Sequence, residues 1–169
     1  QNLRSGELTT VRFGTTDSIC EFILPDVLCQ LKQFSPEADL QLVTAESNEV
    51  LDQLCNGTID IALSVHYVES DGGHSGLQSV ELFQDSLLLV TSNSHPWVRG
   101  TPPAGNADLA GQRYLLPGER STSAQMVREW FNHHSIELSN CVEIPSLRAA
   151  IRLVETGFGV GVAPAWAID

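Results

Sequence analysis

The alternation of apolar strands with amphipathic helices in the first part of this chain is the feature that most constrains its fold. Short apolar runs typical of buried strands alternate with segments in which apolar side chains recur at helical spacing. The predicted strands are residues 11–13, 40–45 and 60–64, and the predicted helices are residues 18–34 and 47–55. This order of elements predicts an α/β unit built on a parallel sheet.

The first predicted strand leads into its helix through a loop that is rich in hydroxyl groups, Gly14 to Ser18. Ser18 precedes Glu21 by three residues, which is the spacing of a capping box. A helix that begins there directs unpaired backbone N–H groups and a partial positive charge toward the loop, which suits a polar or anionic ligand. Two interpretations remain: the hydroxyls of Thr15, Thr16 and Ser18 bind a ligand, or they only cap their own helix.

The helix predicted over residues 18–34 is apolar over a wider surface than one core requires. The apolar stripe consists of Ile19, Phe22, Ile23, Val27, Leu31 and Phe34, flanked by Cys20, Leu24 and Leu28. Pro25 removes one backbone hydrogen bond and is expected to bend the helix. Such a helix is either sandwiched within its own chain or also covered by a partner subunit.

The second half of the chain repeats the alternation after a change of pattern. Residues 77–82 and 86–92 are expected to form paired strands, and the Pro- and Gly-rich segment 93–108 is expected to mark a domain boundary. Further strands are predicted at 114–116, 141–144 and 159–163, with helices around 126–131, at 146–154 with Ser146 as its cap, and from Pro164 onward. We therefore expect two α/β units, residues 1–92 and residues 93–169.

The net charge of −12 argues against direct binding of this segment to nucleic acid, because clustered basic side chains hold a phosphate backbone. The nine lysines and arginines are instead dispersed along the chain. No run approaches the roughly 20 apolar residues that span a bilayer, so no membrane contact is expected. The chain begins with Gln1 and shows no signal peptide, so we expect a cut or processed piece of a longer protein. If that protein contacts DNA, it does so with a part that is missing here.

The sequence carries no motif for a metal, a cofactor or catalysis. It has no Gly-Lys-Ser/Thr phosphate loop, no HExxH and no GxSxG. Gly157, Gly159 and Gly161 follow a predicted helix and precede a strand, which is the reverse of the dinucleotide-binding order. The five histidines lack metal-ligand spacing with a cysteine, and the carboxylates are too scattered to identify an acid–base pair. We therefore expect no metal, no cofactor and no catalytic residue.

The four cysteines, Cys20, Cys29, Cys55 and Cys141, show no CxxC spacing. Three of them fall at apolar helical positions, where a reduced cysteine behaves as a small hydrophobic side chain. This usage predicts reduced thiols in the cytoplasm, with a redox sensor as the alternative.

Taken in order, these features resemble the effector-binding domain of LysR-type transcriptional regulators. The matching segments are Leu3–Leu8 with Val11–Gly14, Leu24-Pro25, Phe34 with Pro36, Leu54 with Gly57 and Ile59–Ala62, Leu87–Val90, His95-Pro96, Asp108-Leu109, and Val154 with Gly157–Val160 and Pro164. No single segment is specific, but the series stays in register over nearly the whole chain.

The resemblance implies two Rossmann-like α/β subdomains of the periplasmic-binding-protein (type 2) fold, with a small-molecule effector in the cleft between them. It implies that an N-terminal winged helix-turn-helix domain, absent from this chain, contacts DNA, and that the regulator works as a dimer or tetramer. In this family the domain continues past the equivalent of Asp169 with a return strand and a helix, so we expect the C-terminal part to be missing. The first helix then pairs with a partner subunit, and its expected interface residues are Phe22, Val27, Cys29 and Leu31.

Effector contacts carry over from the family by position. The first subdomain is expected to contribute Thr16, Ser18, Ser47, Val65 and His66, and the second is expected to contribute Arg120, Pro145, Ser146 and Val162. Some family members have a cationic residue near Val65, and His66 is able to replace it when protonated. For Arg120 a solvated loop position is the alternative to an effector contact.

The function that follows is a bacterial, cytoplasmic sensor domain, not an enzyme, that binds a small polar or anionic metabolite. One alternative is a periplasmic solute-binding protein, which would carry a secretion signal upstream. The other is an enzyme on the same bilobal fold, which would need a convergent catalytic pair in the cleft.

Overall fold

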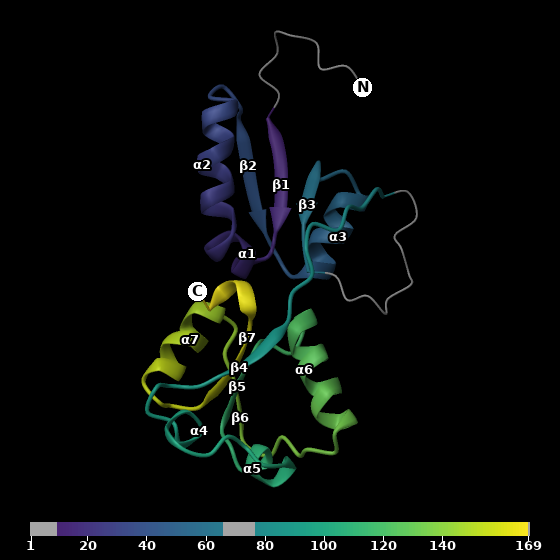
Figure 1. Ribbon diagram of the computed structural model, residues 1–169. Helices are drawn as coiled ribbons and strands as arrows, with labels where there is room; N and C mark the ends of the chain where they lie inside the picture. Colours follow the sequence, from purple (N-terminus) through teal and green to yellow (C-terminus); the bar gives the residue numbers. More distant parts are fainter. Residues whose placement is uncertain (1–9, 66–76, 169) are drawn as a thin grey trace. The chain divides into compact units, whose positions relative to one another are not determined.

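The computed structural model describes residues 10–65 and 77–168 (Figure 1). The chain divides into two compact units, Gln1–Ser79 and Val80–Asp169, which are considered one at a time. This division lies earlier in the chain than the boundary expected after residue 92, because the strand at residues 87–90 pairs within the second unit. No helix within the described residues is long and apolar enough to cross a membrane.

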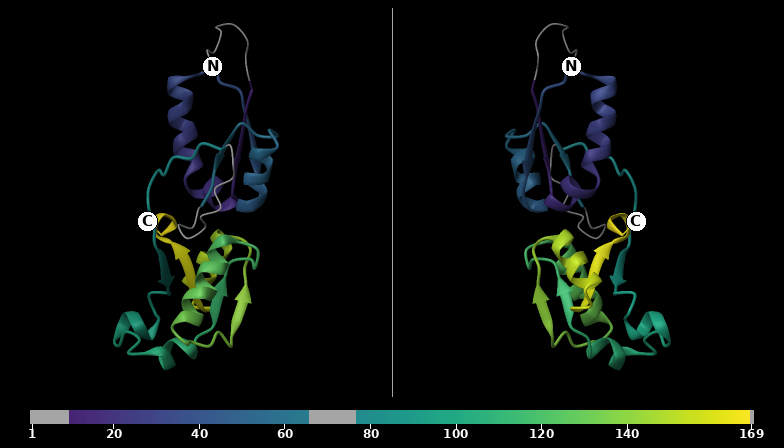
Figure 2. Two further views of the ribbon diagram at one scale, coloured as in Figure 1. Left: turned by 90° about the vertical axis from the view of Figure 1, so that its right-hand side faces the viewer. Right: turned by 90° about the vertical axis from the view of Figure 1, so that its left-hand side faces the viewer.

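The described part of the first unit is a three-stranded parallel sheet, as the sequence predicted. Its elements are β1 (Val11–Thr15), α1 (Asp17–Phe22), α2 (Leu24–Phe34), β2 (Leu40–Thr44), α3 (Ser47–Cys55) and β3 (Ile61–Leu63). The strand order is β2-β1-β3, so the chain crosses over in opposite directions from β1 to β2 and from β2 to β3. Right-handed crossovers then place α2 and α3 on opposite sides of the sheet (Figure 2).

The single helix predicted over residues 18–34 is in fact two helices, α1 and α2, which are separated at Ile23. Pro25 lies in the first turn of α2, where its missing N–H would have no partner in any case. The bend expected at Pro25 is therefore a break just before it. The buried side chains Ile19 and Leu24 stand on either side of this break.

The described part of the second unit is a four-stranded mixed sheet in the order β4-β7-β5-β6. Its elements are β4 (Leu87–Val90), α4 (Pro96–Arg99), α5 (Asn106–Ala110), β5 (Tyr114–Leu116), α6 (Thr122–His133), β6 (Cys141–Glu143), α7 (Leu147–Glu155), β7 (Val160–Pro164) and the short 3₁₀ turn η1 (Ala165–Ala167). Strands β5, β6 and β7 are parallel, and β4 runs antiparallel to β7. The helix expected from Pro164 is thus only a 3₁₀ turn that begins after this residue.

The strand predicted at residues 77–82 is wrong, because these residues form no strand. Its expected partner, β4, pairs with β7 instead, in the register Leu87 with Pro164 and Val90 with Gly161. Val80 and Leu82 are largely exposed. A strand is stabilised by the partner it finds in the fold, and the partner of β4 lies far away in the sequence.

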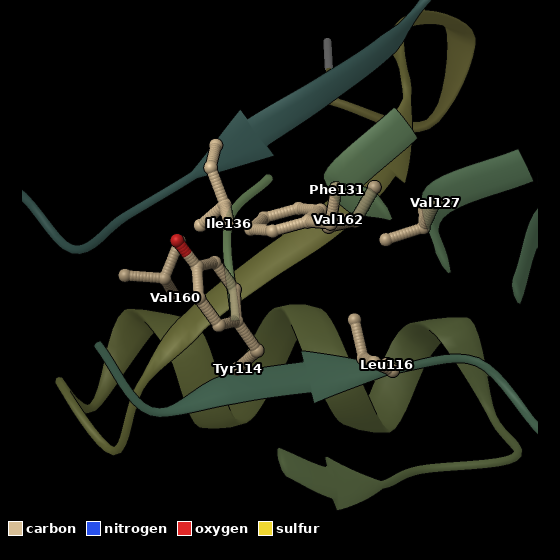
Figure 3. Packing of buried hydrophobic residues seen from close by; sticks show 7 residues of the cluster. All are labelled: Tyr114, Leu116, Val127, Phe131, Ile136, Val160 and Val162. Carbon is tan, nitrogen blue, oxygen red and sulfur yellow. The ribbon is translucent and has the colours of Figure 1, made fainter. Parts of the chain in front are cut away.

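The core of the second unit is a cluster of seven buried side chains on β5, α6, β7 and the loop after α6 (Figure 3). The cluster consists of Tyr114, Leu116, Val127, Phe131, Ile136, Val160 and Val162. The rings of Tyr114 and Phe131 pack edge to face with 4.9 Å between their centroids. The Tyr114 hydroxyl donates to the carbonyl of Leu109 over 2.8 Å, and burial raises the pKa of Tyr114 to about 12.

Candidate functional site

The carboxyl ends of β1, β2 and β3 meet at one edge of the first sheet, because the three strands are parallel. The Thr15 hydroxyl donates to the carbonyl of Leu63 at the end of β3 over 2.8 Å. The backbone N–H of Ala45, just after β2, donates to the carbonyl of Thr15 over 3.0 Å. Thr15 is fully buried and thus ties the three strand ends together. Helices α1 and α3 both begin at this edge.

The hydroxyls of Thr16 and Ser18 lie 3.2 Å apart at the start of α1, and both residues are half-buried. The expected capping box is not formed: α1 begins at Asp17, its N-cap is Thr16, and no side chain caps it. Ser18 is therefore inside the first turn, where its hydroxyl faces Thr16 rather than a backbone N–H. Each hydroxyl offers one donor and two acceptor lone pairs, so a single mutual bond leaves both able to bind a ligand.

Two further serines lie at the same edge. Ser47 is the first residue of α3 and is buried, although the N-cap of that helix is Glu46. Ser64 directly follows β3, and its hydroxyl oxygen is inaccessible and has no hydrogen-bond partner. Ser64 is not among the residues predicted from the sequence to bind an effector. The sequence signal that could have indicated Ser64 is its position: it is the polar residue that ends the apolar run after Asp60. Buried hydroxyls normally have a hydrogen-bond partner, so the unpaired hydroxyl of Ser64 is an exception.

The other residues expected from the first subdomain are Val65 and His66. Val65 is half-buried and follows Ser64. His66 lies outside the described residues, so its expected role stays a prediction.

In the second unit, α6 and α7 begin where the parallel strands β5 and β6 end, and serine hydroxyls cap both helices. Ser146 Oγ accepts the backbone N–H of Ala149 over 3.3 Å, which confirms the predicted cap. Ser121 Oγ accepts the backbone N–H of Ala124 over 3.1 Å. Pro145 precedes the first cap and is exposed, and Arg120 is exposed on the loop before the second.

Val162 differs from the other expected contacts because its side chain is part of the core of the second unit. It is 6% exposed and packs with Leu116 and Phe131, while its backbone lies beside Leu89 of β4. A small apolar side chain in this position stabilises the fold. It offers a ligand no polar group and little surface.

The two edges differ in charge. Residues 14–18, 44–48 and 62–65 of the first unit include no lysine or arginine, whereas the second edge carries Arg120. Arg12, on β1, is instead paired with Asp60 just before β3, with 2.8 Å between Nη2 and Oδ1. Hydrogen bonds from the side chain and backbone of Arg12 lower the pKa of Asp60 to about 2.

A cavity of about 400 Å³ lies elsewhere in the first unit. It is lined by Leu54, Asp60, Ile61, Ala62, Leu77 and Gln78. None of the described residues that are expected to bind an effector lines it.

The residues expected at a partner interface lie on α1 and α2. Val27 and Cys29 are exposed, and Phe22 and Leu31 are half-buried. Phe34, at the end of α2, is 83% exposed. The described part of the first unit therefore leaves much of the apolar stripe of α2 in contact with solvent.

The four cysteines are unpaired, and three of them, Cys29, Cys55 and Cys141, are exposed, so they do not act as core residues. Burial raises the pKa of the Cys141 thiol, which disfavours the reactive thiolate. Among the described residues, no three His, Cys, Asp or Glu side chains form a group that could hold a metal ion.

Two α/β units with helix starts and hydroxyl groups at the carboxyl edges of their parallel strands form a two-subdomain fold of the periplasmic-binding-protein type. The sequence matches the family model described as LysR substrate binding domain over residues 4–169. The chain therefore belongs to the family of LysR substrate-binding domains.

Individual relatives agree with this assignment. The chain is 31% identical over 158 residues to the uncharacterized HTH-type transcriptional regulator YwqM of Bacillus subtilis (strain 168), an alignment that covers 92% of this chain and 52% of the relative. It is 28% identical over 160 residues to the probable cat1 operon transcriptional activator of Acinetobacter lwoffii, and this alignment covers 93% of this chain and 51% of the relative. The chain thus spans about half the length of these curated relatives.

The solved structure of the BenM effector-binding domain with its effector benzoate is also similar. Its TM-score is 0.69 at 21% sequence identity, and the match covers 95% of this chain and 72% of that one. A likeness at this level of identity shows a shared fold.

Proposed function

We propose that this chain is the ligand-sensing regulatory domain of a LysR-type DNA-binding transcriptional regulator, and that its two carboxyl edges bind a small polar or anionic metabolite. The observation that carries the proposal is the Thr16–Ser18 hydroxyl pair, which stands at a helix start and caps no backbone group. Ser47 and the unsatisfied hydroxyl of Ser64 add polar groups to the same edge.

The charge of the two edges supports an effector with both a polar and an anionic end. Hydroxyls on the first edge suit a neutral polar group, and the Arg120 guanidinium suits a carboxylate, which it can bind with two parallel hydrogen bonds. The effector of BenM, benzoate, is a carboxylate, which is consistent with this chemistry in a protein of the same fold. The role is regulatory and needs no catalytic group.

As membership of the LysR family implies, the complete regulator would contact DNA through an N-terminal winged helix-turn-helix domain in the cytoplasm. The charge of −12 on this chain agrees, because it would repel phosphate. Effector binding would favour one conformation of the regulator over another, by as much as the effector's affinity differs between them.

We further propose that α2 mediates assembly into a homodimer or tetramer, since its exposed apolar side chains would be buried there. The substitution Val27→Asp would place a charge on this face and lower the mass measured by light scattering. Glu37→Ala, a change at an exposed residue after α2, is the control. An unchanged mass for Val27→Asp would contradict the interface.

The ligand proposal is tested by thermal-shift screening with carboxylates, aromatic acids and amino acids, followed by titration of the compounds that raise the melting temperature. The double variant Ser18→Ala/Ser47→Ala removes two hydroxyls worth about 1 kcal/mol each, so it should weaken binding by at least about tenfold. Ser35→Ala/Ser139→Ala, at two exposed serines, should bind as the wild type does. Unchanged affinity in the first double variant would show that the site lies elsewhere.

A further inference from the structure

The loop that joins β5 to α6 is held by a side chain from the neighbouring strand. Oε1 of Glu143 accepts the backbone N–H of Glu119 over 2.8 Å. Glu143 is the last residue of β6 and pairs in register with Leu116, the last residue of β5. The ladder continues one residue further, where Ile144 N–H donates to the carbonyl of Leu116 over 2.8 Å. The carboxylate therefore reaches the loop just after the loop leaves the sheet.

The loop also has bonds of its own, but these link it to itself and to the helix that follows. Ser121 N–H donates to the carbonyl of Gly118 over 2.9 Å, and Arg128 lies 3.5 Å from the carboxylate of Glu119. Both side chains of that ion pair are well exposed, so it constrains the loop weakly. The bond to Glu143 is different in kind, because it fixes the loop to a strand that is distant in sequence.

Glu143 is also close in sequence to the segment between β6 and α7. Pro145 and Ser146 follow Glu143 by two and three residues, and Arg120 directly follows the residue whose N–H it accepts. One side chain thus connects the two segments of the second unit that are expected to contact the effector. A bond between an ionised acceptor and a backbone N–H is stronger than one between neutral groups, which suits it to this task.

We propose that Glu143 is a positioning residue of the effector site. By accepting the N–H of Glu119, it fixes the position of Arg120 relative to Pro145 and Ser146 at the start of α7. This inference rests on the function proposed above. Glu143 itself contacts the loop and acts on the effector only through Arg120.

Three variants separate positioning from plain stabilisation. Glu143→Ala removes the acceptor, Glu143→Gln keeps an oxygen acceptor without the charge, and Glu137→Ala is a matched loss of an exposed glutamate in the same unit. Two quantities are measured on each: amide hydrogen exchange at residues 118–121, and the affinity for benzoate added at up to millimolar concentration as a carboxylate probe. Melting temperatures ensure that every variant is compared while folded.

We expect Glu143→Ala to speed exchange at the Glu119 amide by about tenfold and to weaken benzoate binding by about three- to tenfold, as the loss of one charge-assisted hydrogen bond implies. Glu143→Gln should restore both quantities to within about twofold of the wild type, and Glu137→Ala should change neither.

Other outcomes overturn the inference. Unchanged exchange in Glu143→Ala would show that the bond does not hold the loop. Faster exchange with unchanged benzoate affinity would show that the bond stabilises the fold without positioning Arg120. Failure of the wild type itself to bind benzoate or any compound of the thermal-shift screen would refute the proposed function, and this result is seen before any Glu143 variant is made.

Discussion

The starts of α1 and α7 both follow a parallel strand and both carry a serine, yet they use the hydroxyl differently. Ser146 accepts the backbone N–H of Ala149 and so caps α7. Ser18 lies inside the first turn of α1, and its hydroxyl faces that of Thr16, 3.2 Å away. The hydroxyl of Ser146 therefore contributes mainly to the fold of the second unit, whereas the hydroxyl of Ser18 caps no backbone group.

The two units also differ in their cores, in the charge at their edges and in their exposed apolar residues. The second unit holds a compact core of seven side chains and a cationic side chain, Arg120, at its edge. The first unit has hydroxyls at its edge and leaves apolar residues of α2 exposed, including Phe34 at 83%. Under the proposed function, the second unit would supply charge from a well-packed scaffold, and the first would supply hydroxyls and a surface for another subunit.

The largest loss of stability is expected from a substitution in the core of the second unit. Phe131→Ala should lower the free energy of unfolding of the second unit by about 3–5 kcal/mol, because it empties a buried site beside Tyr114. Phe34→Ala, an exposed counterpart in the first unit, should change stability by less than about 0.5 kcal/mol. Far-ultraviolet circular dichroism in urea follows the unfolding of both units. The fluorescence of the three tryptophans, Trp97, Trp130 and Trp166, follows the second unit alone, because all three lie in it. Equal losses in the two variants would remove the contrast between the units.

A smaller effect separates the two serines. Ser146→Ala should destabilise the protein by about 1 kcal/mol, because the first turn of α7 loses its cap. Ser18→Ala should cost less than about 0.5 kcal/mol, since no backbone group depends on it. Urea denaturation of the two variants measures both values. If Ser18→Ala proved as costly as Ser146→Ala, its hydroxyl would be a cap after all.

The smallest effect concerns pH and again distinguishes the units. The folded pKa of Asp60 is about 2, below the ordinary 3.8, so its pairing with Arg12 stabilises the first unit above pH 3.8 and is lost as the pH falls toward 2. The pKa of Tyr114 is raised from 10.0 to about 12, so its stabilising effect is full below pH 10 and is lost as the pH rises toward 12. Asp60→Asn should flatten only the acid limb of melting temperature against pH, and Tyr114→Phe only the alkaline limb. A variant that altered the opposite limb would contradict this assignment.

The parallel β-α-β order of the first unit could be predicted because apolar periodicity and the helix-starting residues are local signals. The cap at Ser146 was also local and was confirmed. Three features depended on the fold and could not be read from neighbouring residues. They are the pairing of β4 with β7, the separation of α1 from α2 at Ile23, and the bond from Glu143 to Glu119.

The candidate site shows the same limit. Hydroxyl residues near a strand end can be recognised from the sequence, but whether each serves as a cap depends on where the helix begins, and α1 begins one residue earlier than expected. Val162 was expected to contribute to the site from its position at a strand end, and only the packing shows that its side chain belongs to the core. Ser64 was missed because nothing local shows that a hydroxyl will be buried without a partner.

The account is tested most directly by mapping the backbone amide shifts that benzoate, or a stronger compound from the thermal-shift screen, causes in a nuclear magnetic resonance titration. The account predicts that the largest shifts fall at Thr16 and Ser18, at Ser47, and at Arg120 and Ser146, and that Ser18→Ala/Ser47→Ala reduces them at equal ligand concentration. Shifts confined to the separate cavity lined by Leu54, Asp60 and Ile61 would contradict it, because the ligand would then bind away from both carboxyl edges.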